Sequence, residues 1–118
     1  MKLENCVFCN INPRLYLEEN QSAFAIWDKH PVSPGHALVI TKEHYNDLFE
    51  VPLDVIRDVH ELILKMKNRI DLEKSPHGYN LGANVGKEAG QTVFHFHFHI
   101  IPRYENDGLW KAKEVVTR

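Results

Sequence analysis

The chain has 118 residues, of which 43% are hydrophobic and 25% charged, and its formal net charge is −2 at pH 7. These values predict one globular domain, residues 1–118, and exclude a broad basic surface for nucleic acid or anionic lipid, so anion binding would need a local site. The start MKLENCVFCN lacks the apolar segment of a secretion signal, and no run approaches the roughly 20 apolar residues that span a membrane. We therefore expect a cytoplasmic protein that binds neither membranes nor nucleic acid.

Both cysteines lie near the start, as Cys6 and Cys9. In a reducing compartment a C-x-x-C pair indicates a metal site or a redox pair more than a structural disulfide. The spacing is that of half a zinc site, whose remaining two ligands would be sulfur or nitrogen donors. A redox pair, which here lacks a thioredoxin-like βαβ setting, and two thiols without special chemistry are the alternatives.

Two short strands come next, over residues 22–28 and 36–42, where β-branched and aromatic residues are bounded by turn formers. Two prolines and a glycine between them predict a chain reversal. Asp28 ends the first strand, and an aspartate before a turn commonly bonds the local backbone.

A long helix is predicted from Pro52 to Lys74. Its apolar residues recur at intervals of three and four, which places them on one side of a helix: Val55, Ile56, Val59, Leu62, Ile63, Met66 and Ile70. Asp54 near the start and Lys65, Lys67 and Arg69 near the end suit the helix dipole.

The second half of the chain contains two further predicted strands, residues 79–85 and 93–101, joined by a loop with glycines over residues 86–91. Pro102 is expected to end the last strand. Several strands with one long helix, not in strict βαβ order, indicate an α+β domain on a largely antiparallel sheet.

The last strand carries three histidines with period two, His95, His97 and His99. Because successive side chains of a strand face opposite sides, the phenylalanines between them should lie in the core and the imidazoles on the other face, about 6.5 to 7 Å apart. A plain solvent face would normally carry Lys, Glu, Thr or Ser, so the pattern favours metal binding or nucleophilic catalysis.

Hydrogen-bond donors precede the histidine strand. Glycines allow backbone N–H groups to approach an anion closely, and amide and hydroxyl side chains add further donors: Asn84, Gly86, Gly90, Gln91 and Thr92. This loop beside a row of imidazoles indicates phosphate chemistry. Imidazole, with a pKa near ~6.5, is largely unprotonated at neutral pH and can attack phosphorus.

The stretch from His95 to Ile101 resembles the signature of the histidine triad (HIT) family of nucleotide hydrolases and transferases. The likeness extends through AGQTVFH, CVFC, WDKHPVSPGHALVI and KEH. The chain most resembles the bacterial zinc-containing members of the family, and the resemblance covers about residues 6 to 110. The resemblance implies a HIT-like fold, with a mainly antiparallel sheet of about five strands, one long helix and a short helix, and a homodimer.

The resemblance also implies roles for individual residues. His97 would attack the α-phosphorus of a purine nucleotide derivative, giving a nucleotidyl-histidine intermediate that water hydrolyses. His99 would contact the phosphate, with His36 close behind. Further phosphate contacts would come from Asn84, Gly90, Gln91 and Thr92, the ribose contact from Asp28, and the walls of the base pocket from Phe8, Ile11, Ile26 and Trp27.

The zinc-containing members imply a structural zinc ion held by Cys6, Cys9, His44 and His95. In relatives the C-terminal segment packs near the active site of the dimer partner, which raises the same possibility for Trp110. The remaining histidines and one arginine are expected at the surface: His30, His60, His77 and Arg103.

The expected function is cleavage at the α-phosphate of nucleoside phosphoramidates, nucleotidyl esters or dinucleoside polyphosphates. One alternative is a metal-dependent phosphohydrolase that uses the histidine strand as its ligands, because metal-bound water hydrolyses phosphates well. A second alternative is a module that binds nucleotides without turnover.

Overall fold

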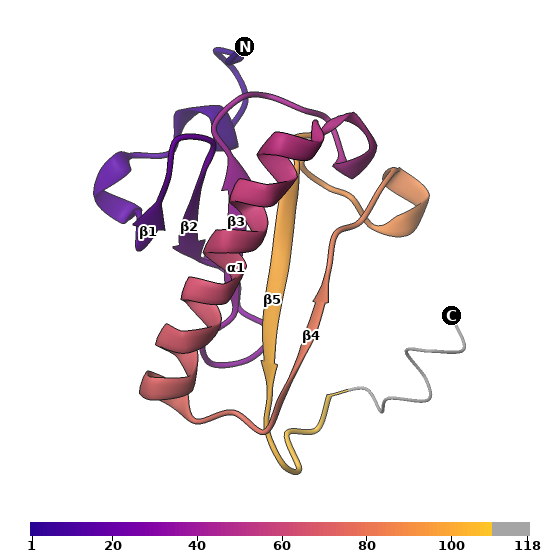
Figure 1. The fold of residues 1–118 in the computed structure, drawn as a ribbon. Helices are drawn as coiled ribbons and strands as arrows, with labels where there is room; N and C mark the ends of the chain where they lie inside the picture. Colours follow the sequence, from indigo (N-terminus) through magenta and orange to yellow (C-terminus); the bar gives the residue numbers. More distant parts are fainter. Residues whose placement is uncertain (110–118) are drawn as a thin grey trace.

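The computed structural model describes residues 1–109, which form a five-stranded antiparallel sheet covered on one face by a long helix (Figure 1). The strand order is β1-β2-β3-β5-β4. The elements are β1 (Glu18–Glu19), β2 (Ala23–Trp27), β3 (Ala37–Thr41), α1 (Leu53–Lys74), β4 (Gly78–Gly82) and β5 (His97–Arg103). Four single turns of 3₁₀ helix complete them: η1 (Phe8–Asn10), η2 (Pro13–Leu15), η3 (Leu48–Glu50) and η4 (Lys87–Ala89). The predicted α+β class and the five-stranded sheet are confirmed.

Helix α1 has the bounds that its apolar periodicity predicted, to within one residue at its start. Val59, Leu62, Met66 and Ile70 are buried at intervals of three and four and face the sheet. The helix stops at Ser75, whose φ of 49° is left-handed and cannot continue a right-handed helix.

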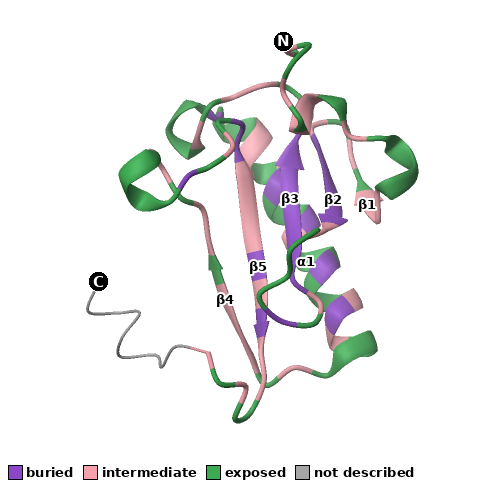
Figure 2. Ribbon diagram, turned by 180° about the vertical axis from the view of Figure 1, so that it is seen from behind, coloured by how far each residue is buried: buried purple, intermediate pink, exposed green. Residues whose placement is uncertain are grey.

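The two faces of the sheet differ in side-chain size. Towards α1 the central strands present small residues, Ala23, Ala25, Ala37 and Val39, so the helix can lie close to the backbone. The opposite face carries the larger Phe24, Ile26, Leu38 and Ile40, against which Phe8, Ile11 and Tyr16 pack. Both central strands are therefore buried on both sides, as the purple of β2 and β3 shows in Figure 2.

Strand β5 begins later and ends later than predicted. It starts at His97 rather than Val93, and Phe94, expected in the core, is 50% exposed. The strand also continues through Pro102 to Arg103. Proline is tolerated here because β3 pairs with β5 only as far as Ile100, so the missing N–H leaves no bond to β3 unmade.

Strand β4 is shorter than predicted, ending at Gly82 rather than Val85.

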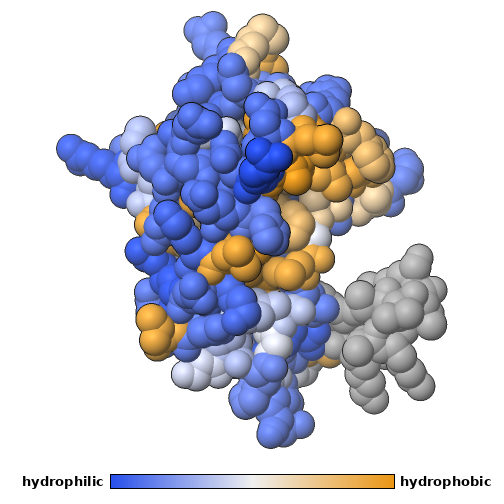
Figure 3. All heavy atoms as spheres, viewed as in Figure 1, coloured by the Kyte–Doolittle hydropathy of each residue, from blue (hydrophilic) through white to orange (hydrophobic). Residues whose placement is uncertain are grey.

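Viewed with α1 in front, most of the surface is hydrophilic and hydrophobic side chains gather in a few patches (Figure 3). Within residues 1–109 no helix is both long and apolar enough to cross a membrane. Trp110 lies outside the described residues.

Candidate active site

A cavity of about 770 Å³ lies on the sheet face opposite α1. Ten of the residues expected from the sequence line it: Phe8, Ile11, Ile26, Trp27, Asp28, Asn84, Gly90, Thr92, His97 and His99. Six lining residues were not predicted: Val7, Leu15, Lys29, His30, Leu38 and Val93. Of these, Leu38 could have been found, because strand alternation puts it on the face of Ile40, whereas His30 was expected at the surface.

A hydrogen bond to the backbone orients the His97 ring. Its Nδ1 lies 2.8 Å from the carbonyl oxygen of His95. A carbonyl oxygen only accepts, so Nδ1 carries the proton and the neutral ring has its lone pair on Nε2. The Phe8 ring packs edge-on against His97, with 4.9 Å between ring centroids. In its neutral form the residue that lines the cavity thus presents its lone pair on Nε2.

His99 lies next to His36 and, through it, to Asp28. His36 Nε2 is 3.0 Å from His99 Nδ1 and 3.2 Å from Asp28 Oδ2. Burial, together with the neighbouring His97 and His36, lowers the pKa of His99 to about 4. Burial also lowers the pKa of His36, against the opposing effect of Asp28. Both rings are therefore neutral at pH 7.

His36 does not line the cavity; it lies behind His99, as the resemblance implied. Asp28 has a local role as well as its place on the cavity wall, because its Oδ1 accepts the backbone N–H of His30 at 2.8 Å. Since each carboxylate oxygen has two lone pairs, this bond leaves acceptor capacity for a ligand.

The glycine loop before β5 is held together by Gln91. Its Oε1 accepts the N–H of Gly86 at 2.8 Å, and its Nε2 donates to the carbonyl oxygens of Asn46 and Val93 at 2.7 and 3.2 Å. The side chain is 4% exposed and is not part of the cavity wall. Its partners are therefore backbone groups of the loop, of the segment before η3 and of the chain that follows the loop, and not a phosphate in the cavity, where a contact was expected.

Two glycines of this loop have backbone angles that favour glycine, φ 91° at Gly86 and 95° at Gly90. At Gly90 an added Cβ would stand 3.3 Å from Asn84 Nδ2, so the glycine also lets the Asn84 amide approach the loop closely. Thr92 completes the polar wall beside His97. Of the five donors expected for an anion, Asn84, Gly90 and Thr92 thus line the same cavity as the imidazoles, whereas Gly86 and Gln91 do not.

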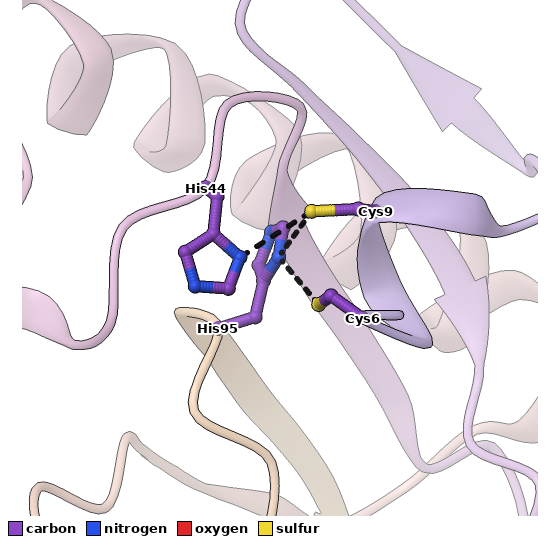
Figure 4. Close-up of side chains that lie close together, drawn as sticks. All are labelled: Cys6, Cys9, His44 and His95. Carbon is purple, nitrogen blue, oxygen red and sulfur yellow. Dashed lines mark hydrogen bonds between the residues drawn. The ribbon is translucent and has the colours of Figure 1, made fainter. Parts of the chain in front are cut away.

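A second cluster joins the N-terminal segment to the start of β5. The ligand atoms of Cys6, Cys9, His44 and His95 all lie within 4.8 Å of one another, and Figure 4 shows the four side chains converging. His95 Nδ1 is 3.3 Å from Cys6 Sγ and 3.4 Å from Cys9 Sγ, and His44 Nδ1 is 3.3 Å from Cys9 Sγ. Tetrahedral zinc with bonds of about 2.3 Å to sulfur and 2.0 Å to nitrogen separates such atoms by about 3.5 Å.

The outer contacts of the two histidines also fit zinc. His95 Nε2 donates to the Thr41 carbonyl at 2.7 Å, and His44 Nε2 lies 3.1 Å from Asn46 Oδ1. These acceptors fix the proton on Nε2 and leave the Nδ1 lone pairs facing the sulfurs, as in histidines that bind zinc. Cys9 Sγ accepts the N–H of Leu3 at 3.2 Å, which suits a thiolate.

Comparison with known proteins identifies the family. A model of the HIT domain matches residues 10–106. This chain belongs to the HIT family.

Three relatives illustrate how similar this HIT protein is to known members. It is 39% identical over 115 residues to adenylylsulfatase HINT3 of Arabidopsis thaliana, a match that covers 94% of the chain but only 58% of the plant protein. It is 36% identical over 118 residues to adenosine 5'-monophosphoramidase HNT1 of Saccharomyces cerevisiae, covering 93% of the chain and 72% of the yeast protein. The crystal structure of a HIT family protein from Bacillus anthracis matches with a TM-score of 0.81 and 36% identity, covering 96% and 86% of the two chains.

Proposed function

We propose that this HIT protein is a nucleotide hydrolase that cleaves at the α-phosphate through a covalent nucleotidyl intermediate on His97. The observation that carries the proposal is the bond from His97 Nδ1 to the His95 carbonyl, because it leaves the Nε2 lone pair on a residue of the cavity wall. The names of the plant and yeast relatives, an adenylylsulfatase and an adenosine monophosphoramidase, support the same class of reaction.

The reaction has two steps on the same imidazole. In the first, the Nε2 lone pair of His97 attacks the α-phosphorus and the bond to the leaving group breaks. In the second, water attacks phosphorus and releases a proton to solvent, the P–N bond breaks and Nε2 regains its lone pair. Dividing the displacement in this way replaces one slow step with two easier ones.

Donors around His97 would hold the phosphate during both steps. His99, Thr92 and Asn84 line the cavity with His97, and Gly90, which has no side chain, lies close to the Asn84 amide. Donors that are already fixed in position stabilise developing charge without reorganising, and one such donor is typically worth about 3 kcal/mol of barrier. Gln91 would contribute by holding the loop in shape.

The apolar half of the cavity would take the nucleoside. Phe8, Ile11 and Ile26 form a wall suited to a flat base, and Asp28 offers carboxylate oxygens for ribose hydroxyls. A volume of about 770 Å³ is within the range of small-molecule sites. We therefore propose a purine nucleotide derivative as the substrate.

We further propose a structural zinc ion, one per chain, bound by Cys6, Cys9, His44 and His95. When bound, zinc would cross-link the N-terminal segment to the residue that precedes β5. His95 would then be fixed through its side chain while its carbonyl oxygen holds His97. A homodimer is also proposed; within the described residues β4 pairs only with β5, which leaves its outer edge open to a second copy.

The decisive experiment is to quench turnover of a nucleotide labelled at the α-phosphorus and to locate the label. The wild-type protein should carry it on His97, and His97→Gln should carry none. A metal-dependent phosphohydrolase would turn over the substrate without labelled protein, and a binding module would show neither label nor turnover. Either outcome in the wild-type protein would refute the proposal.

A further inference from the structure

We infer that Cys6 and Cys9 place the nucleoside pocket under redox control: when an oxidant such as hydrogen peroxide joins them in a disulfide, the metal is released and nucleotide binding weakens. The inference rests on the zinc ion and the nucleotide site of the proposed function, and it concerns the regulation of that site. It follows from the position of the cysteine pair, because the turn that carries both sulfurs also carries part of the cavity wall.

The two cysteines flank residues of the cavity wall. Val7 and Phe8 stand between Cys6 and Cys9 in the sequence, and both line the cavity of about 770 Å³. Ile11 follows shortly after Cys9 and lines the same cavity. A movement of this turn therefore moves apolar side chains of the pocket proposed for the base.

Within the described residues, the segment 3–10 reaches the rest of the chain by hydrogen bonds only through its two sulfurs. Two of its backbone N–H groups bond inside the segment, that of Cys6 to the Leu3 carbonyl and that of Asn10 to the Val7 carbonyl. The side-chain amide of Asn10 likewise donates only to carbonyl oxygens of the segment. Polar contact between this segment and the rest of the molecule therefore depends on the cysteines.

The histidine side of the cluster has support that does not involve sulfur. His95 Nε2 donates to the Thr41 carbonyl at 2.7 Å, and the backbone N–H of Phe96 donates to the Tyr45 carbonyl at 2.7 Å. These bonds hold the chain at the start of β5 whether or not the sulfurs bind a metal. Loss of the metal should therefore loosen the cysteine turn and leave the bond from His97 to the His95 carbonyl in place.

Without the metal, apolar packing is what holds the turn against the sheet. Phe8 and Ile11 pack against the large side chains of β2 and β3, and the Phe8 ring lies edge-on to His97. Val7 is 58% exposed and adds little to this packing. Apolar contacts are not directional, whereas bonds from a metal to sulfur and nitrogen have a fixed geometry. The metal is thus the directional link that fixes the Phe8 ring at the wall of the pocket.

The cysteine pair is placed for disulfide formation. Its sulfurs lie within 4.8 Å of each other, on one side of the cluster (Figure 4). A helical turn joins the two residues, since Val7 has φ −61° and ψ −38° and η1 begins at Phe8. Both cysteines are partly exposed, so a small oxidant can reach them. Pairs with this spacing undergo thiol–disulfide chemistry in oxidoreductases.

The oxidation consumes two thiolates and one peroxide. One thiolate attacks a peroxide oxygen, an S–O bond forms, the O–O bond breaks and hydroxide leaves. The second thiolate attacks that sulfur, the S–S bond forms and a second hydroxide leaves. The two sulfurs lose two electrons and the peroxide gains them. Neither sulfur then carries the negative charge that binds zinc, so the ion is released as Zn²⁺.

The test compares adenosine 5'-monophosphate binding, measured by calorimetry, between the reduced, zinc-loaded protein and the protein oxidised with hydrogen peroxide. The intact mass of the chain reports the disulfide, and a chromogenic chelator reports the released zinc in the same samples. Oxidation should form one disulfide, release one zinc ion per chain and weaken binding by about 10-fold, the order expected for one aromatic contact. A dithiol reductant with added zinc should restore the affinity, and the thiol-specific oxidant diamide should act as peroxide does.

Three controls locate the effect at the base wall. Ribose 5-phosphate, which lacks the base, should bind reduced and oxidised protein equally in an NMR titration. Phe8→Ala should bind the nucleotide weakly in both states, with little difference between them, because the ring that the metal fixes is absent. Cys9→Ser should not respond to either oxidant, since it cannot form the disulfide.

Long-range ¹H–¹⁵N spectra of the wild-type protein report the histidine side directly, and neutral His97 should stay protonated on Nδ1 in both redox states. The inference is overturned if the oxidised protein binds the nucleotide as tightly as the reduced protein, or if ribose 5-phosphate loses as much affinity. It is also overturned if the thiols and the zinc survive excess peroxide, or if His97 changes its tautomer. A reduced protein that binds no nucleotide, or no zinc, would instead be a failure of the proposed function.

Discussion

Acidification should destabilise the protein through His99, and the size of the effect follows from its buried position. In the unfolded chain a histidine has a pKa near ~6.5, whereas in the folded protein burial lowers the pKa of His99 to about 4. The unfolded state therefore binds the proton more readily, and stability falls as the pH drops from about 6.5 towards 4. Between about pH 7.5 and pH 5 these two pKa values correspond to a loss of about 2 kcal/mol of unfolding free energy.

Urea denaturation at the two pH values measures this loss, with His99→Gln as the matched control. The glutamine does not titrate, so its unfolding free energy should fall by about 2 kcal/mol less than that of the wild-type protein over the same interval. His95, whose pKa burial also lowers to about 4, titrates in both proteins and cancels in the difference. Equal losses in the two proteins would show that His99 is not held neutral in the folded state.

Three further predictions concern the loop, the nucleophile and the metal cluster. Gln91→Ala should lower the unfolding free energy by about 2 kcal/mol or more in urea denaturation, because the N–H of Gly86 and the carbonyl oxygens of Asn46 and Val93 lose their bonds to this side chain. A change below about 0.5 kcal/mol would contradict the role of Gln91 in holding the loop. His97→Gln should lower kcat by about 10⁴-fold or more with little change in substrate affinity measured by calorimetry. A loss confined to affinity would show that His97 takes no part in the chemical step. A chelator should release one zinc ion per chain. It should lower the unfolding free energy by about 4 kcal/mol relative to protein at a thousandfold excess of free zinc over Kd. Cys9→Ser should be insensitive to the chelator, and an equally insensitive wild-type protein would argue against the metal.

The sequence predicted those elements whose burial repeats along the chain. Helix α1 buries one residue in every three or four, and β2 and β3 are short apolar runs between turn formers, so local pattern and final position agree. Where tertiary contacts override the pattern, the prediction was wrong. The histidine–phenylalanine alternation suggested a strand from Val93, but the strand starts at His97 and Phe94 remains half exposed.

Residues that act through their side-chain type were also visible in the sequence. The spacing of the histidines, the glycine loop and the C-x-x-C pair indicated phosphate and metal chemistry, and the structure brings ten of the twelve proposed active-site residues to one cavity wall. The two exceptions lie behind the wall: Gln91 bonds to backbone groups that include the Asn46 carbonyl, and His36 bonds to the Val32 N–H and to the His99 ring. A side chain's type says what it can bond, whereas which group it meets depends on how distant segments pack.

The protonation pattern of the site is the clearest example of what only the tertiary structure decided. Histidine residues in the sequence are chemically alike, and each can place its proton on either nitrogen. The carbonyl of His95 sets the proton of His97 on Nδ1, and the N–H of Val32 sets those of His36 and His99 on Nε2. The sequence determined which imidazoles are present, and the folded backbone, by offering a fixed donor or acceptor to each, determined which can attack and which can only donate.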